Sequence, residues 1–243
     1  IGIDTVILIR AGYRQRATFD SEVLHDAANI RPVHLDLVDL FLCEAARCGR
    51  FDSVTVAEID AELVRAVRRN GDRYAVNVAH AQGVQRLTVD DCLLLNPGHP
   101  ADARRLDDAL ARATEVATCL PSVQVFDAGG EQSVACTLAR ALEREGPPLL
   151  VYAAENHNHA AERLDAAVRR HRRTRRRPVQ FVNTVIGKMS RCVSDAKLIR
   201  SAELAPIAPG IPRAFLVEEF NRIQVSRIAL PAFEPGLSMV EQK

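Results

Sequence analysis

The chain has 243 residues, of which 47% are hydrophobic and 26% charged, a composition typical of a globular protein with one large domain, or one domain and a smaller lobe. Its formal net charge is +1, tryptophan is absent and 5% of the residues are aromatic, which argues against a nucleic-acid partner. No apolar run approaches the roughly 18 residues of a membrane span and no signal peptide is visible, so no membrane association is expected.

Strands and helices are predicted to alternate along most of the chain. Residues 5–9 have strand character but no assigned place in a sheet, and the first strand of the sheet is predicted at residues 23–25. Further strands are predicted at 54–57, 74–78, 91–95, 115–118, 149–153, 179–182, 215–218 and 222–225. Helices are predicted at 35–47, 61–69, 102–112, 132–145 and from after Asn156 through Arg170.

This alternation predicts a Rossmann-type α/β fold, in which helices cover both faces of a doubly wound, mostly parallel sheet. Residues 149–153 are the most apolar strand, as expected for a central parallel strand. We expect residues 1–205 to form a dinucleotide-binding domain and residues 206–243 to form connecting strands that lead toward a further domain.

Two features of composition need separate explanations. The six cysteines stand at irregular spacings without a Cys-x-x-Cys pair, which favours small buried residues over disulfides or zinc and predicts a cytoplasmic location. Residues 169–177 are a run of arginines interrupted by His171 and Thr174. The run could bind phosphate or nucleic acid, but we favour the basic end of a helix followed by a solvated loop, because cations complement the helix dipole there.

Ligands of a doubly wound sheet bind at the carboxyl ends of its strands. Glu58 ends the second strand, where a carboxylate can accept both hydroxyl groups of an adenosine ribose and repel a 2′-phosphate, which favours NAD over NADP. The alternative is an acid at a helix N-terminus, a role that Asp60 fits equally well. The loop after the predicted first strand places Asn29 and Ile30 near the cofactor but has no glycine, so pyrophosphate binding is predicted to be impaired or made differently.

Polar residues also follow the most apolar strand. The Asn156 amide can donate to a carbonyl or alkoxide oxygen and so stabilise a transition state, although a helix N-cap is an alternative role. His157 and His159 are spaced i, i+2, which would place them on different sides of a helix and disfavours a metal site.

Several stretches of the chain resemble the long-chain polyol dehydrogenases, specifically the mannitol-1-phosphate 5-dehydrogenase branch. The similar stretches are VTVAEID at 54–60, EVATCLPS at 115–122, LVYAAEN at 150–156, FVNTVIGKM at 181–189 and VEEF at 217–220, in register from about residue 23 to residue 235. The resemblance implies that Glu58 binds the ribose and that Asn156 holds the reacting oxygen. It also implies a cofactor-binding set of Thr118, Leu120, Pro121, Glu155 and Asn183.

The chain departs from this family in three places. The glycine-rich loop is replaced at residues 26–32, and Gly187-Lys188 stands where the family usually has Asp-Arg. The family's helical substrate domain has no counterpart in this sequence, and Lys243 matches the start of the segment that carries the family's lysine general base. The sequence is therefore expected to be a fragment, or to be completed by another chain or a homo-oligomer.

Three functions remain open. The first is an NAD-dependent oxidoreductase of a polyol or sugar phosphate, with Lys243 as base and Asn156 polarising the oxygen. The second is a non-catalytic Rossmann-like protein that has lost cofactor binding. The third is an S-adenosylmethionine methyltransferase, which also uses an acid after the second strand but has no counterpart of Glu155-Asn156.

Overall fold

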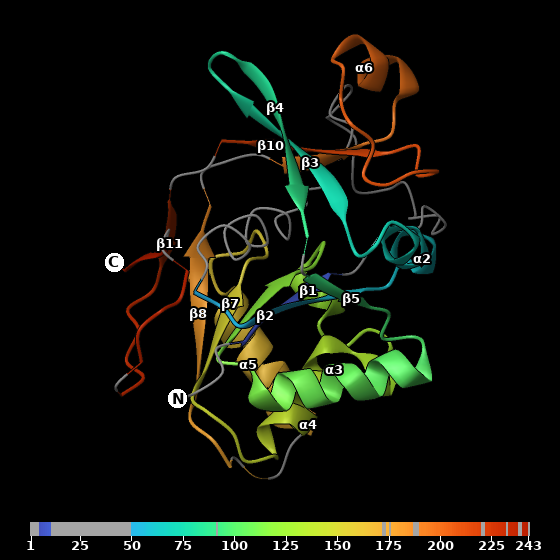
Figure 1. The fold of residues 1–243 in the computed structure, drawn as a ribbon. Helices are drawn as coiled ribbons and strands as arrows, with labels where there is room; N and C mark the ends of the chain where they lie inside the picture. Colours follow the sequence, from blue (N-terminus) through green and yellow to red (C-terminus); the bar gives the residue numbers. More distant parts are fainter. Residues whose placement is uncertain are drawn as a thin grey trace, which may run out of the picture.

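The structure is a computed structural model, and it describes residues 50–90, 92–171, 174, 176–186, 190–219, 222–231, 233–237 and 240–242, together with the backbone of residues 5–10 (Figure 1). Within these residues the strands form two sheets, a main sheet of eight strands and a second sheet of four. The main sheet with its covering helices confirms the predicted α/β class.

The main sheet has the strand order of a dinucleotide-binding fold. Six parallel strands lie side by side in the order β5 (Cys92–Leu95), β2 (Ser53–Glu58), β1 (Thr5–Arg10), β6 (Glu115–Cys119), β7 (Leu149–Ala153) and β8 (Val179–Val185). Numbered by their order in the chain, these strands have the spatial order 3-2-1-4-5-6. The direction in which successive strands are added to the sheet reverses between β1 and β6. β11 (Ile223–Val225) continues the sheet antiparallel to β8, and β12 (Val240–Gln242) lies parallel to β11.

The first strand of the sheet is β1, and its position corrects the sequence-based assignment. β1 pairs on one side with β2 and on the other with β6, so Thr5–Arg10 fills the central place that was predicted for residues 23–25. Residues 23–25, and the helix predicted at 35–47, lie outside the described residues. The apolar run of residues 5–9 carries the strand pattern of a buried central strand, but local pattern alone does not say which strands pair.

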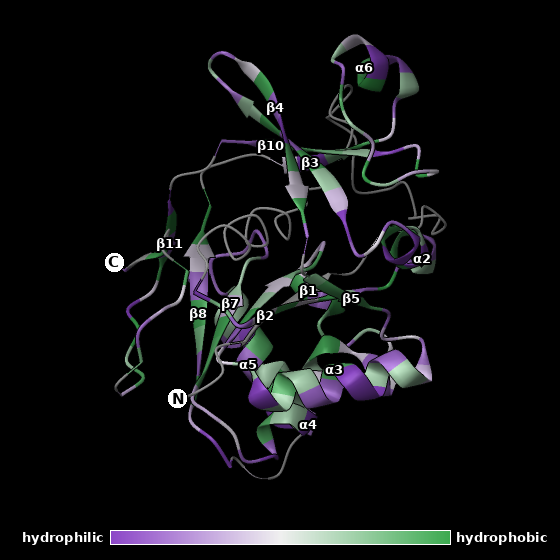
Figure 2. Cartoon of the chain, in the orientation of Figure 1, coloured by the Kyte–Doolittle hydropathy of each residue, from purple (hydrophilic) through white to green (hydrophobic). Residues whose placement is uncertain are grey.

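Each face of the main sheet has its own hydrophobic core. Alternate residues of a strand point to opposite faces, so Leu149, Val151 and Ala153 of β7 pack with the helices α3 (Pro100–Arg112), α4 (Val134–Leu142) and α5 (Ala160–His171). Leu150 and Tyr152 face the other side, where α2 (Ala61–Arg69) and the second sheet pack. In Figure 2, α3 carries alternating hydrophilic and hydrophobic segments, as expected of a helix with one buried face.

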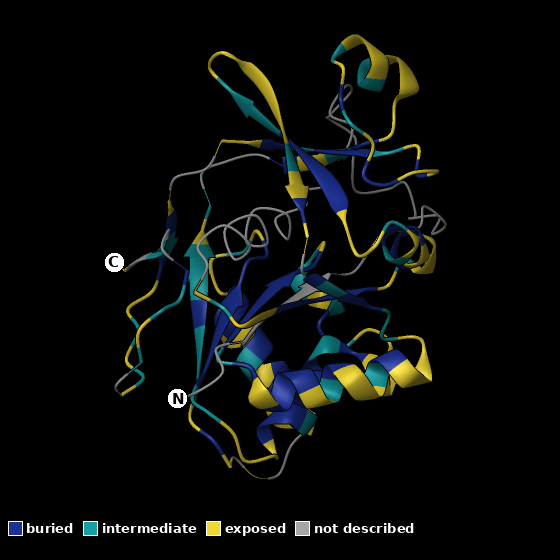
Figure 3. Cartoon of the chain, in the orientation of Figure 1, coloured by how far each residue is buried: buried dark blue, intermediate teal, exposed yellow. Residues whose placement is uncertain are grey.

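The second sheet was only partly predicted. Its order is β4 (Gly83–Val89), β3 (Tyr74–His80), β10 (Ala214–Glu218) and β9 (Ser190–Val193), and the short helix α6 (Ala196–Ser201) lies near it, far from α3 and α4 (Figure 1). β4 was missed because it is an edge strand with mostly exposed side chains, visible in Figure 3, and so lacks the buried alternation that marks a strand. β10, from the C-terminal side of the predicted boundary at residue 205, pairs with β3 and β9 from the N-terminal side; the boundary itself stays a prediction.

Three of the described arginines of the basic run, Arg169, Arg170 and Arg177, make contacts within the fold. Arg169 forms an ion pair with Asp165, and Arg170 forms one with Asp127. The prediction of a solvated loop is wrong for Arg177, which is 3% exposed and donates to the carbonyl groups of Leu110, Ala111 and Ala113 at 2.8–3.3 Å. This guanidinium satisfies carbonyl groups that the end of α3 leaves without helical partners.

Candidate functional site

The carboxyl ends of the parallel strands bring most of the predicted site residues to one edge of the main sheet. The pairing register aligns Thr118 of β6 with Ala153 of β7, and Ala153 with Asn183 of β8. Glu58 ends β2 and aligns with the last residue of β1. Because β1 separates β2 from β6, this edge spans the point at which the winding direction reverses, where ligands of such sheets bind.

Glu155 joins the ends of β6 and β7. Its Oε2 accepts a hydrogen bond from Thr118 Oγ1 at 3.1 Å, and its Oε1 accepts one from the Leu120 backbone N–H at 3.0 Å. The side chain is 4% exposed, and this burial raises the pKa of the carboxyl to about 7 even though the Leu120 N–H and the Thr118 hydroxyl favour the charged form. Three of the predicted cofactor-binding residues are therefore bonded to one another, and their contacts fix the loop that follows β6.

Asn183 caps a helix from a neighbouring strand. Its Oδ1 accepts from the backbone N–H of Ala161 at 2.9 Å, in the first turn of α5, and its Nδ2 donates to Glu162 Oε2 at 2.8 Å. The bond from Asn183 is the largest cause that lowers the pKa of Glu162. Both functional atoms of this predicted cofactor ligand are thus used to hold α5 against β8.

Asn156 is an exposed polar residue at this edge. It follows Glu155 directly, its side chain is exposed, and within the described residues no hydrogen bond holds it. The alternative role of N-cap does not apply, because α5 begins four residues later, at Ala160. His157 and His159 also precede the helix, so the expectation that a helix would separate them is replaced by a turn in which the His159 N–H donates to His157 Nδ1 at 3.0 Å.

Two roles were considered for an acid after β2, a ribose ligand and an acid at a helix N-terminus, and the structure assigns the second to Asp60. Asp60 is the N-cap of α2, since its Oδ1 accepts from the backbone N–H groups of Glu62 and Leu63 at 3.0 and 3.2 Å. Glu58 is 1% exposed at the strand end, and its Oε1 accepts from the Asp60 N–H at 2.7 Å. The residue between them, Ile59, is 50% exposed, and its carbonyl accepts from Asn96 Nδ2 at 3.1 Å.

Arg213 is a residue of this edge that sequence reasoning missed. Its Nη2 lies 2.7 Å from Asp60 Oδ2, and both side chains are partly exposed. Burial opposes the charged form of Asp60, but the bonds from Arg213, Leu63 and Glu62 outweigh it and lower the pKa of the carboxyl. No local pattern could have indicated this contact, because 153 residues separate the two partners.

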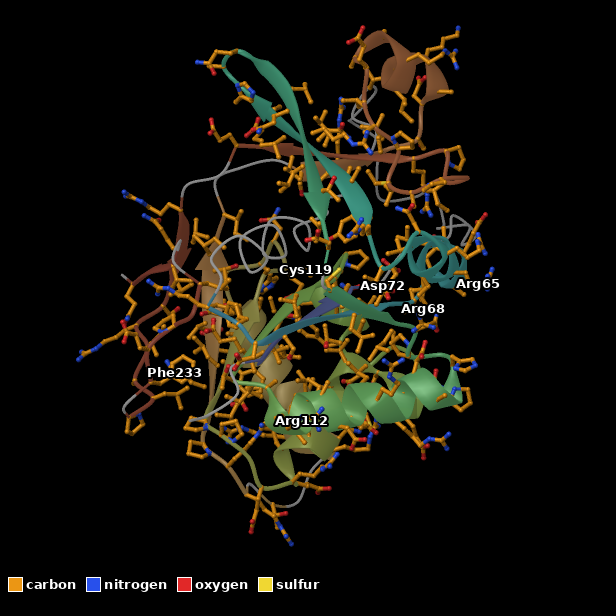
Figure 4. All side chains as sticks on the ribbon, viewed as in Figure 1. Arg65, Arg68, Asp72, Arg112, Cys119 and Phe233 are labelled. Carbon is orange, nitrogen blue, oxygen red and sulfur yellow. The ribbon has the colours of Figure 1, made fainter. Side chains whose placement is uncertain are left out.

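Of the remaining predicted site residues, the structure describes some and leaves others outside the described part of the chain. Pro121 is exposed immediately after Leu120, on the loop that Glu155 fixes. Cys119, labelled in Figure 4, lies at the start of that loop, between the main and second sheets, and is buried in the core between them. Asn29, Ile30, Lys243 and the Gly187-Lys188 pair lie outside the described residues.

The described residues contain no group of three or more His, Cys, Asp or Glu side chains arranged to hold a metal ion. Of the four cysteines among them, Cys92 and Cys119 are buried, and Cys136 and Cys192 are partly buried. Of the helices in the described part, none is both long and apolar enough to cross a membrane.

The sequence matches no model of a known protein family and none of the curated proteins. Solved structures of dehydrogenases do match the fold. A D-sorbitol dehydrogenase in substrate-free form is 11% identical with a TM-score of 0.64, over 97% of this chain and 53% of that one. An octopine dehydrogenase with NADH and pyruvate is 10% identical with a TM-score of 0.52, over 98% of this chain and 50% of that one. The chain spans about half the length of these structures, and at this level of identity the likeness establishes one thing, the Rossmann-type fold.

Proposed function

We propose that the chain is the cofactor-binding part of an NAD-dependent oxidoreductase that acts on a polyol or sugar phosphate. The observation that carries the proposal is the combination of a 3-2-1-4-5-6 parallel sheet with an acid at the end of its second strand. The fold likeness to an octopine dehydrogenase solved with NADH and to a sorbitol dehydrogenase supports it. The substrate class rests on the sequence resemblance to long-chain polyol dehydrogenases.

Side chains at this edge suit the parts of NAD. The carboxylate of Glu58 accepts the ribose hydroxyl groups, and the exposed side chain of Ile59 offers an apolar surface beside it for the adenine ring. The loop of Leu120 and Pro121, held by Glu155, forms the floor beneath the nicotinamide. NAD, when bound, supplies the hydride acceptor or donor.

Two residues act on the substrate in this proposal. Asn156 is exposed at the end of β7 and donates its amide N–H to the reacting oxygen, whose negative charge it stabilises. Lys243 removes the hydroxyl proton as general base, an assignment that rests on the resemblance alone.

A second candidate is a Rossmann-like protein that does not bind a cofactor. The observation that favours it is the internal use of the predicted ligands, since Thr118 and Leu120 are bonded to Glu155, Asn183 caps α5, and Glu58 is 1% exposed. A ribose can reach Glu58 only where the surrounding chain gives access to its carboxylate.

A fluorescence titration with NADH on the purified chain separates the two candidates. We expect saturable binding that weakens roughly tenfold or more in Glu58→Gln, because the amide keeps the acceptor for the Asp60 N–H and loses the charge that binds the hydroxyl groups. Glu62→Gln is the matched control, an exposed glutamate in the first turn of α2, and its affinity should equal that of wild type. No binding at millimolar NADH refutes the oxidoreductase, and unchanged binding in Glu58→Gln refutes the role of Glu58.

A further inference from the structure

We infer that Asp60 and Arg213 together determine the selectivity of this chain for NAD over NADP, an inference that rests on the proposed function. The two dinucleotides differ by one phosphate on the 2′ oxygen of the adenosine ribose, which is the group assigned to Glu58. Asp60 follows Glu58 by two residues and contacts Arg213, and the sequence resemblance assigns a role to neither Asp60 nor Arg213.

A chain of contacts runs from the Glu58 carboxylate through the backbone and side chain of Asp60 to Arg213. The Asp60 backbone N–H donates to Glu58 Oε1 at 2.7 Å, and the Asp60 carboxylate forms an ion pair with Arg213 at 2.7 Å. The side chains of Asp60 and Arg213 are 24% and 28% exposed, so a ligand at the end of β2 can reach both. Arg213 comes from the segment before β10, which therefore brings the second sheet to the ribose end of the site.

Charge decides what this arrangement accepts. The Asp60 carboxylate balances the positive charge of the Arg213 guanidinium, so the pair does not attract a 2′-phosphate. A guanidinium is well suited to bind a phosphate, because its five N–H donors form a planar fork. In this chain Asp60 engages Arg213 and so withholds it from a 2′-phosphate.

The variant Asp60→Asn isolates this effect. Asparagine caps a helix as well as aspartate does, and the backbone N–H that donates to Glu58 is unchanged, so α2 and the ribose acid keep their supports. The substitution removes one negative charge and weakens the hold on Arg213. Asp195→Asn is the matched control, because Asp195 caps α6 with the same pair of backbone bonds and lies on the second sheet's side of the molecule.

The measurement is the ratio of the dissociation constants of NADPH and NADH, obtained by fluorescence titration of each variant of the whole chain. We expect the ratio to fall roughly tenfold or more in Asp60→Asn, as a charge-assisted hydrogen bond to phosphate becomes available. The ratio should stay at the wild-type value in Asp195→Asn and return toward it in Asp60→Asn combined with Arg213→Gln.

The outcomes separate this inference from the proposed function. If Asp60→Asn binds NADH and its ratio of dissociation constants is unchanged, the inference is overturned and the proposed oxidoreductase function is not. The same holds if the improved NADPH binding of Asp60→Asn persists when Arg213 is also replaced. A wild-type chain that prefers NADPH also overturns it. A wild-type chain that binds neither dinucleotide overturns the proposed function, and the inference with it.

Discussion

Replacing Glu155 with glutamine should remove a pH dependence from the stability of the fold. The carboxyl is buried between β6 and β7, and its pKa is raised to about 7 from an ordinary value of 4.5. Between these values the folded chain keeps the proton that the unfolded chain has released. Glu155 therefore makes the fold less stable as the pH rises from 4.5 to 7, and the penalty stays constant above that range.

The size of the effect follows from the two pKa values. A difference of this size corresponds to about 3 kcal/mol in full, and to about 2 kcal/mol between pH 5 and pH 8. Glutamine has nearly the same shape, and its Oε1 can still accept from the Leu120 N–H, while its amide can donate to the Thr118 oxygen. The variant should thus keep the hydrogen bonds to Leu120 and Thr118 but have no titrating proton.

Urea denaturation at a series of pH values between 5 and 8 measures this effect. Relative to wild type, Glu155→Gln should gain about 2 kcal/mol in free energy of unfolding as the pH rises through this range. Glu145→Gln, at an exposed position, should follow the wild-type curve at a constant offset. A Glu155→Gln curve that also runs parallel to wild type would show that the buried carboxyl does not titrate in this range and would refute the reasoning.

Two further predictions concern structural side chains. Arg177→Ala should lower the free energy of unfolding by about 2–4 kcal/mol, because it leaves buried carbonyl groups at the end of α3 without a hydrogen-bond donor. Arg176→Ala, at an exposed position, should change the free energy of unfolding by less than about 0.5 kcal/mol. Thermal denaturation of both variants measures these effects, and equal effects would contradict the capping role of Arg177. Gly236→Ala should cost about 1–3 kcal/mol in urea denaturation, because the added Cβ would lie 2.6 Å from Phe51 Cζ and 3.0 Å from a Glu115 oxygen. Combining it with Phe51→Leu should recover part of that loss, and a fully additive double variant would rule out the clash with the ring.

Elements with a complete local signal were predicted to within a few residues. Residues 61–69 form α2 as predicted, because the segment begins after the capping Asp60 and ends at Asn70-Gly71. Residues 149–153 form β7, a run that is apolar throughout and buried on both faces of the sheet. Elements that depend on distant partners were missed, and β9 is the example, since it is defined by its pairing with β10, which lies beyond α6 in the chain.

The candidate site shows the same division between local and distant information. The positions of Glu58, Glu155 and Asn156 at strand ends follow from the sequence, because an apolar run that ends in a polar residue marks the carboxyl end of a strand. What each side chain bonds to does not follow. The carboxylate of Glu155 accepts from a loop 35 residues away, and the amide of Asn183 caps a helix that begins 23 residues before it.

The sequence by itself therefore determined the fold class and the set of polar residues along one edge of the sheet, because the periodicity of apolar residues and the turn signals between them are local properties. The tertiary structure decided which segment is the central first strand, since β1 owes its place to pairing with both β2 and β6. It also decided that Asp60 meets Arg213 across 153 residues. Hydrogen bonds and ion pairs of this kind depend on how strands and helices pack, and a chain specifies that packing only through all of its residues together.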